Sequence, residues 1–158
     1  MSTFDLAQVD RLLTTTKAVR KRLDLDRPVE REVIVECLRL ATFAPNASNT
    51  QQWRWVVVTD QEKREEIARL YRRPYELAQQ SDDGGHFATA DEAAQRVLAS
   101  SVYLIEHLHR VPVFIIPCYL ERPNPEGGNL ALASLYRSIL PAAWSLQLAL
   151  RSRGLGSA

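Results

Sequence analysis

The sequence predicts a fold in which a mixed β-sheet is packed against several helices. Two segments, Trp53–Thr59 and Val111–Leu120, are rich in β-branched and aromatic residues and have polar boundaries, as buried strands do. Most of the remaining chain follows helical hydrophobic spacing, and long helical connections between strands are typical of a sheet that helices cover. The 158 residues, 46% of them hydrophobic, suffice for one domain with its own core.

Two helices are expected before the first strand. Apolar residues at helical spacing predict one over Phe4–Leu13 and another over about Glu30–Phe43. The Pro45-Asn46 pair ends the second helix, because a residue before proline avoids helical backbone angles. A polar loop then leads to the strand.

Two more helices are expected between the strands. Thr59 and Glu62 fit a capping box, which predicts a helix from Asp60 to about Tyr71. The helical pattern then decays over Pro74–Thr89, a polar stretch with glycines that we interpret as a surface loop. Helical spacing returns over Asp91–His109.

The second strand and the carboxyl-terminal third are rich in proline. Pro112 and Pro117 favour an edge position or interrupted pairing for the strand, since proline has no N–H to donate. Two prolines and two glycines make Glu121–Asn129 a turn-rich segment. Whether the strands run parallel or antiparallel is left open.

A long apolar segment closes the chain. The helical pattern resumes at Leu130, and Ser138 is expected to cap a new helix over Ile139–Arg153, with Pro141 tolerated in its first turn. This helix carries small and apolar residues on nearly every side, so we expect it to be the most buried one. Gly154 is expected to end it.

Composition and charge exclude several classes of function. Twenty basic and nineteen acidic residues give a net charge of +1, which provides no overall field to hold a nucleic acid or an anionic bilayer. No apolar run approaches the roughly 20 residues of a membrane span. Residues 1–10 lack the features of a signal peptide, so a cytoplasmic location is expected. Cys37 and Cys118 lie far apart and predict neither a disulfide framework nor a zinc site.

Common catalytic and metal motifs are missing from the sequence. No metal site is predicted from His86, His107 and His109, because His107 and His109 lie two residues apart and point to different sides of a helix. The chain contains no Gly-x-Ser-x-Gly elbow, no Walker loop and no Gly-x-Gly-x-x-Gly after a strand. By residue type alone, Gly154–Ser157 is a helix stop rather than a phosphate loop.

Four cations lie close together near the amino end. Lys17, Arg20, Lys21 and Arg22 precede an Asp24-Leu25-Asp26 segment. They form either an exposed turn whose charges the aspartates balance, or a clamp for one phosphate, because guanidinium groups match phosphate oxygens.

A second cluster is the polar loop over residues 45–52, Pro-Asn-Ala-Ser-Asn-Thr-Gln-Gln. Its short amides and hydroxyls can offer donors and acceptors to the edge of a planar heterocycle, and loops between rigid elements often carry binding sites. The same residues also form ordinary turns.

Together the two clusters resemble the FMN-dependent nitroreductase family. Arg20 falls where that family has the basic phosphate ligand of an Arg-Arg-Ser-x-Arg type turn. Asn49 and Gln51 coincide with the Asn and Gln of its Pro-Ser-x-x-Asn-x-Gln-Pro-Trp loop, and Pro45 and Trp53 with the first and last residues of that loop. The resemblance continues through Val111-Pro112-Val113 at a strand entry.

The resemblance ends in Leu146–Ser157, which looks like the family's interface helix and the turn after it. It therefore covers nearly the whole chain in order. Thr16 and Ala18 depart from the pattern, since they replace the first Arg and the Ser of the phosphate turn. Asn46 and Gln52 also depart from it, since they replace a Ser and a Pro of the loop.

The resemblance implies an α+β fold with a central mixed sheet packed by helices, in a single domain over residues 1–158. It implies a homodimer with FMN at the shared interface, and the implied FMN-binding residues are Lys17, Ala18, Arg20, Arg22, Pro45, Asn46, Ala47, Ser48, Asn49, Gln51, Leu155 and Gly156. No catalytic side chain is nominated, because the flavin carries the chemistry. Trp53, Trp55 and Trp144 are expected in the core rather than stacked on the flavin.

The implied function is hydride transfer from NADH or NADPH through FMN to a nitroaromatic, a quinone or a similar small-molecule acceptor. One alternative is a flavin-binding or flavin-storage protein of the same fold without turnover. Another is a nucleic-acid-binding module, which the near-zero net charge disfavours. Family members continue past the Gly-Leu-Gly turn, so the chain ending at Ala158 is either a truncated form or one in which the missing segment is dispensable. As given, it is expected to dimerise through the helix over Ile139–Arg153 and to hold FMN weakly.

Overall fold

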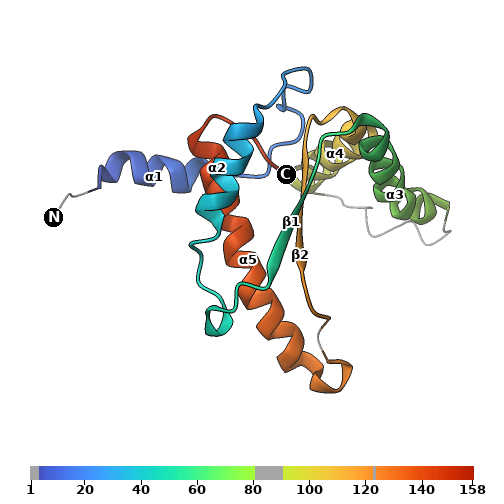
Figure 1. Ribbon diagram of the computed structural model, residues 1–158. Helices are drawn as coiled ribbons and strands as arrows, with labels where there is room; N and C mark the ends of the chain where they lie inside the picture. The colour runs from blue at the N-terminus through green and yellow to red at the C-terminus, as the bar shows by residue number, and fades with distance from the viewer. Residues whose placement is uncertain (1–3, 81–90, 123) are drawn as a thin grey trace. The chain divides into compact units, whose positions relative to one another are not determined.

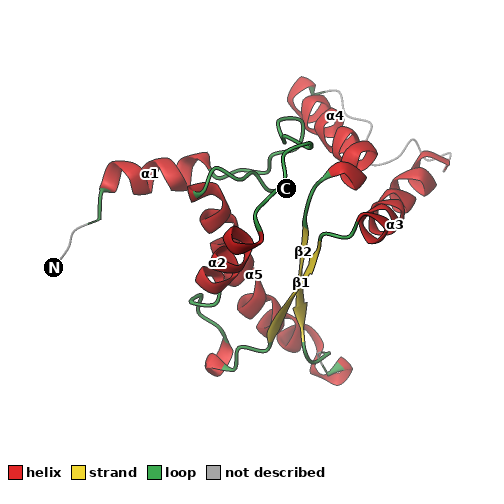
Figure 2. Cartoon of the chain, turned by 45° about the horizontal axis from the view of Figure 1, so that its top comes forward, coloured by secondary structure: helices red, strands yellow, loops and turns green. Residues whose placement is uncertain are grey.

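The computed structural model describes residues 4–80, 91–122 and 124–158 (Figures 1 and 2). Its main elements are α1 (Leu6–Thr15), α2 (Arg31–Ala41), β1 (Trp53–Val58), α3 (Gln61–Gln80), α4 (Glu92–His107), β2 (Phe114–Tyr119) and α5 (Gly128–Ser152). Short 3-10 turns lie at Ala47–Asn49, Leu108–Arg110 and Pro125–Gly127. Helices and a small antiparallel sheet confirm the α+β prediction.

The chain divides into two compact units. The first unit comprises residues 1–18, 29–57 and 115–158, and the second comprises residues 19–28 and 58–114. The single domain expected from the sequence stays a prediction.

The sheet consists of β1 paired with β2. The strands are antiparallel, which the sequence left open, and at one end of the pair the Leu120 N–H donates to the Gln52 carbonyl over 2.9 Å. The predicted first strand is confirmed almost to the residue. The second begins at Phe114 rather than Val111, because residues 108–110 form a 3-10 turn and Pro112 has no N–H for a sheet bond.

The core of the first unit lies between α2 and α5, which run side by side in Figures 1 and 2. Cys37 and Ala41 of α2 and Ala142 of α5 are completely buried. Trp53 of β1 packs with Ala44 and Ala142, as expected for a core tryptophan. The largest set of buried residues on one element belongs to α5 and comprises Ser138, Ile139, Ala142, Leu146, Ala149 and Leu150. The expectation that this helix is the most buried is confirmed.

The predicted break before Ile139 was wrong, because α5 is continuous through Ser138 and Pro141. The Ser138 hydroxyl donates to the Ser134 carbonyl over 3.0 Å, as a residue inside a helix does, instead of capping a new helix. Proline at 141 removes one backbone donor, and burial of both flanking turns outweighs that loss.

The carboxyl end of α5 is confirmed at Gly154. This glycine has φ +76°, in the left-handed region. The Gly154 N–H donates to Arg151 over 3.0 Å and the Leu155 N–H donates to Leu150 over 3.0 Å. These two bonds make a Schellman motif, which satisfies the last helical carbonyls.

At the amino end, α1 begins after Asp5 rather than at Phe4. The Asp5 carboxylate accepts a hydrogen bond from the Gln8 N–H over 3.2 Å and caps the helix. The helix then runs to Thr15, two residues beyond its predicted end, and has no buried residue in this single chain.

In the second unit, α3 is longer than predicted. Asp60 caps it by accepting from the Lys63 N–H over 3.0 Å, so Asp60, not Thr59, is the capping residue. The helix continues past Tyr71 and through Pro74 to Gln80. Because the helix continues, its apolar side chains remain on the face toward α4. A groove of about 620 Å³ on this face is lined by Ile67, Leu70, Tyr71, Pro74, Tyr75 and Ile105. The rest of the predicted loop, residues 81–89, lies outside the described residues.

The end of α4 is tied to α3 by Arg64. Its Nη1 donates to the carbonyls of His109 and Val111 over 3.0 and 2.7 Å. The α4 helix itself begins after Asp91, which accepts from the Ala93 N–H over 3.1 Å. Its predicted range is confirmed to within two residues.

Candidate functional site

The polar loop before β1 has an uncommon backbone. Ser48, Asn49 and Gln51 have φ angles of 53°, 51° and 48°, all in the left-handed region. Residues other than glycine adopt this region at a free-energy cost of about 1–2 kcal/mol each, with asparagine the most tolerant. Such strain persists only where surrounding contacts determine it, and it clusters at functional sites.

Hydrogen bonds fix this loop at several points. The Asn46 Oδ1 accepts from the Gln51 N–H over 2.9 Å, and the buried Ser138 hydroxyl of α5 accepts from the Ala47 N–H over 3.1 Å. The Gln51 Nε2 donates to the Asn49 Oδ1 over 3.2 Å, which pairs the two amides that the sequence singled out.

The loop residues differ in exposure. Pro45, Ser48, Asn49 and Gln51 are exposed, whereas Asn46 and Ala47 are half-buried. The Asn49–Gln51 pairing leaves the Asn49 NH₂ and the Gln51 side-chain carbonyl without another hydrogen bond among the described residues. Two neighbouring exposed amides therefore offer one donor and one acceptor, groups that the edge of a heterocycle requires.

In the first unit, Lys17 and Ala18 adjoin the end of the chain. An isolated parallel bridge pairs Ala18 with Ser157, so Lys17 and Ala18 lie beside the Leu155-Gly156 turn. The sequence predicted all four of these residues as cofactor ligands, and the first unit brings them together.

The other two predicted basic ligands belong to the second unit. Arg20 is half-buried, and its Nη1 lies 3.5 Å from the Ser100 Oγ of α4. Arg22 is exposed. Asp26, one of the two aspartates that could balance the cluster, forms an ion pair of 2.8 Å with Arg110.

The loop and the turn that follows α5 lie at different levels of that helix. Ser138 contacts the loop, and Ser152 is the last helical residue before the turn. The helical rise places these two serines about 21 Å apart along the axis. Figure 1 shows the loop before β1 far from the carboxyl end of the chain. Within one chain, the two parts of the predicted site in the first unit are separate.

One side of α5 is apolar and exposed. Leu132, Tyr136, Leu140 and Trp144 recur every four residues, and their exposed fractions are 42%, 53%, 60% and 45%. Four-residue spacing places side chains on the same face of a helix. Trp144 is therefore not in the core of this single chain, contrary to expectation.

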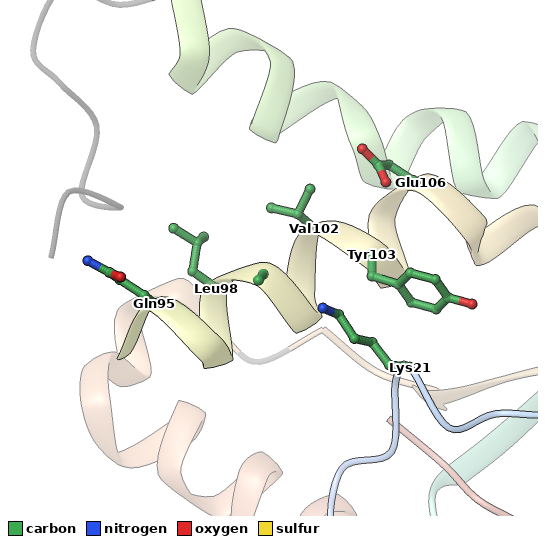
Figure 3. Close-up of a pocket in the computed structure, with 7 residues that line it drawn as sticks. Lys21, Gln95, Leu98, Val102, Tyr103 and Glu106 are labelled. Carbon is green, nitrogen blue, oxygen red and sulfur yellow. The ribbon is translucent and has the colours of Figure 1, made fainter. Parts of the chain in front are cut away.

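A groove in the second unit was not predicted from the sequence. It has a volume of about 430 Å³ and is lined by Lys21, Gln95, Leu98, Ala99, Val102, Tyr103 and Glu106 (Figure 3). Its walls are mostly apolar, with Lys21 opposite α4. The helical spacing of α4 predicted an apolar face, but not that most of the face would stay open, since Leu104 is its only buried residue among those described.

A partly buried ion pair in the first unit was also missed. Arg153 reaches both carboxylate oxygens of Glu36, with Nη2–Oε1 at 2.9 Å and Nε–Oε2 at 3.2 Å. The hydrogen bond from Arg153 lowers the pKa of Glu36 below its ordinary value. Burial raises the pKa of the neighbouring Cys37 thiol, which keeps it protonated and unreactive near neutral pH.

The described residues contain neither a candidate metal centre nor a membrane-spanning helix. No group of three or more metal-ligating side chains occurs in residues 4–80, 91–122 and 124–158. None of the described helices combines the length and apolar character that crossing a membrane requires.

Comparisons with known proteins agree with the resemblance. The family model described as the nitroreductase family matches residues 13–158. Nitrobenzene nitroreductase of Ectopseudomonas oleovorans is 40% identical over 70 residues, which are 44% of this chain and 30% of that protein.

Solved structures are similar in fold at lower identity. A nitroreductase-like family protein from Bacillus cereus has a TM-score of 0.62 at 20% identity, covering 99% of this chain and 70% of that one. Oxidized iodotyrosine deiodinase bound to FMN and 3-iodo-L-tyrosine has a TM-score of 0.66 at 19% identity, covering 95% and 72%. A BluB-like flavoprotein from Clostridium difficile 630 has a TM-score of 0.64 at 20% identity, covering 94% and 71%.

Proposed function

The chain belongs to the nitroreductase family, and from this premise we propose that it is an FMN-dependent oxidoreductase. Its proposed reaction takes a hydride from NADH or NADPH and delivers it to a nitroaromatic, a quinone or a similar small acceptor. The sequence similarity to a nitrobenzene nitroreductase and the fold shared with an FMN-bound enzyme support this proposal.

The observation that carries the proposal is the exposed amide pair in the strained loop. Asn49 and Gln51, joined by a hydrogen bond of 3.2 Å, offer an NH₂ donor and a carbonyl acceptor. This combination fits the pyrimidine edge of a flavin, which carries both donors and acceptors. A loop that is already fixed in left-handed backbone angles is preorganised, so it loses little conformational entropy when a ligand binds.

The phosphate end would be held by cations and backbone groups. Lys17 adjoins Ala18 and the Leu155-Gly156 turn, and the exposed Lys17 and Arg22 are accessible to an anion. Arg20 adds a guanidinium group, which can form a bidentate pair with phosphate oxygens.

Bound FMN would supply the hydride chemistry, accepting from the nicotinamide and donating to the acceptor. The chain's own residues would bind and orient the ring through Asn49 and Gln51 and neutralise the phosphate through Lys17, Arg20 and Arg22. None of these tasks requires a general acid or base from the protein.

We further propose that two copies of the chain form each flavin site. Within one copy, Ser138, which contacts the loop, and Ser152, which precedes the Leu155-Gly156 turn, are about 21 Å apart along α5. The exposed stripe of Leu132, Tyr136, Leu140 and Trp144 would pack against a second α5. A dimer formed through this stripe would allow each flavin site to take its loop from one copy and its phosphate ligands from the other.

The first experiment is an absorbance spectrum of the purified chain mixed with FMN and then freed of unbound flavin. Retained flavin that bleaches with anaerobic NADH or NADPH and reoxidises with a quinone supports the proposed oxidoreductase. Retained flavin that no nicotinamide bleaches would instead support a flavin-storage protein. If flavin is lost at this step, as a weak complex would lose it, FMN is titrated into the chain at equilibrium, and no change in flavin fluorescence in that titration would refute FMN binding by residues 1–158.

A further inference from the structure

We propose that Asn46 and Ser138 are positioning residues that clamp the loop over residues 46–51 in its left-handed conformation. In this assignment Asn46 acts on the loop backbone and is not itself a ligand of the cofactor. The role in cofactor binding rests on the proposed function, whereas the clamp is a property of the free chain.

The loop needs a clamp because its backbone is strained. Ser48, Asn49 and Gln51 all have φ angles near +50°. A short exposed segment without external restraint would relax toward the common negative φ regions. The hydrogen bonds that oppose relaxation are therefore those that decide where the Asn49 and Gln51 side chains point.

Asn46 restrains the end of the loop. Its Oδ1 accepts from the Gln51 N–H over 2.9 Å, spanning five residues. The carbonyl of the same residue accepts from the Asn49 N–H over 3.3 Å, so Asn46 holds two of the left-handed residues. Its side chain is half-buried, consistent with a contact to backbone rather than to solvent.

Ser138 restrains the start of the loop from the core. Its side chain is 1% exposed, and its hydroxyl donates to the Ser134 carbonyl over 3.0 Å. That bond fixes the hydroxyl proton, so an oxygen lone pair is available to accept from the Ala47 N–H over 3.1 Å. The most buried helix thereby sets the position of an exposed binding loop.

The experiment compares Asn46→Leu, Asn46→Asp and Ser138→Ala with the unaltered chain. Leucine removes the acceptor at similar size, whereas aspartate keeps an oxygen that can accept from Gln51 but loses the NH₂ group. Ser134→Ala, one turn earlier on α5, is the matched control for Ser138→Ala. Two quantities are measured: hydrogen exchange of the Ala47 and Gln51 amides without flavin, and the dissociation constant for FMN.

We expect Asn46→Leu to raise the hydrogen-exchange rate of the Gln51 amide, and Ser138→Ala that of the Ala47 amide, by about tenfold. Each variant should also raise the FMN dissociation constant by about tenfold, the scale of one lost hydrogen bond. Asn46→Asp should stay within about threefold of the unaltered chain in both measurements, because the accepting oxygen remains. Ser134→Ala should change neither. Asn46 is only half-buried and lies outside the core, so its variants test the clamp even if Ser138→Ala does not fold.

Other outcomes overturn the assignment. Unchanged exchange in Asn46→Leu would refute the clamp. If Asn46→Asp keeps slow exchange but weakens FMN as much as Asn46→Leu, then the NH₂ group is a direct ligand and the positioning role is refuted. If the unaltered chain binds no FMN, the proposed function fails, and exchange alone still decides whether the clamp exists.

Discussion

Replacing Gly154 tests whether the turn after α5 is held by backbone conformation alone. The residue has φ +76°, and a Cβ added there would meet no atom within 4 Å. Alanine would therefore be strained but would not clash. The left-handed conformation costs alanine about 1–2 kcal/mol. Alanine also lowers the conformational entropy of the unfolded chain, which offsets this cost by about 0.4–1 kcal/mol. The expected net loss in the free energy of unfolding is about 1 kcal/mol.

The assay is urea unfolding of Gly154→Ala and Gly154→Asn beside the unaltered chain. For a chain of this size, about 1 kcal/mol corresponds to a fall in melting temperature of about 2–4 °C. The asparagine variant should lose less, because its side chain tolerates the left-handed region. In the urea experiment, we expect a lower midpoint concentration of urea. The dependence of the free energy of unfolding on urea concentration should not change, since the surface exposed on unfolding stays the same.

Two results would contradict this reasoning. An alanine variant as stable as the unaltered chain would mean that the turn can adopt another conformation at no cost. An asparagine variant no better than alanine would mean that the loss does not arise from the φ angle. Because Leu155 and Gly156 follow directly, we also expect weaker FMN binding in the alanine variant.

Three further predictions concern the site, the ion pair and the proposed interface. Arg20→Ala should weaken FMN binding by about tenfold or more in a fluorescence titration, the scale of a charge-assisted contact; unchanged affinity would transfer the phosphate role to other cations. Because Arg153 lowers the pKa of Glu36, the pair stabilises the fold above the ordinary carboxyl pKa of 4.5, and this contribution is lost as the pH falls through the lowered pKa. Between pH 7 and pH 3, the free energy of unfolding should fall less for Glu36→Gln than for the unaltered chain. Identical pH profiles for the two proteins would argue against a stabilising ion pair. Leu140→Glu places a charge in the exposed stripe of α5 and should reduce the fraction of dimer seen in native mass spectrometry. An unchanged fraction of dimer would exclude this stripe as the interface.

Local sequence signals predicted the elements of the fold well. The strand at Trp53–Val58 and the helix at Glu92–His107 follow from hydrophobic period and polar boundaries that lie in the same short segments. The end of α5 at Gly154 follows from one residue type whose backbone freedom the turn uses. The family, too, followed from motifs in order along the chain, and the match over residues 13–158 confirms it.

Local signals failed where distant contacts decide the outcome. Pro74 and Pro141 suggested interruptions, yet α3 and α5 pass through both. In α5 the flanking turns are buried, and in α3 the apolar face continues toward α4, so packing outweighs one missing hydrogen bond in each. The pairing of Asp26 with Arg110 joins residues that no sequence spacing relates.

The candidate site shows the same division. The sequence by itself determined that residues 45–52 form a polar loop of amides and hydroxyls between a helix and a strand. Only the tertiary structure decided that the Asn46 side chain accepts from the Gln51 N–H while the Asn49 and Gln51 side chains are exposed, and that Ser138 is a buried partner of the loop instead of a helix cap. Residue types limit which hydrogen bonds a side chain can make. The choice among them depends on which groups packing brings within reach, and Ser138 meets Ala47 from 91 positions along the chain.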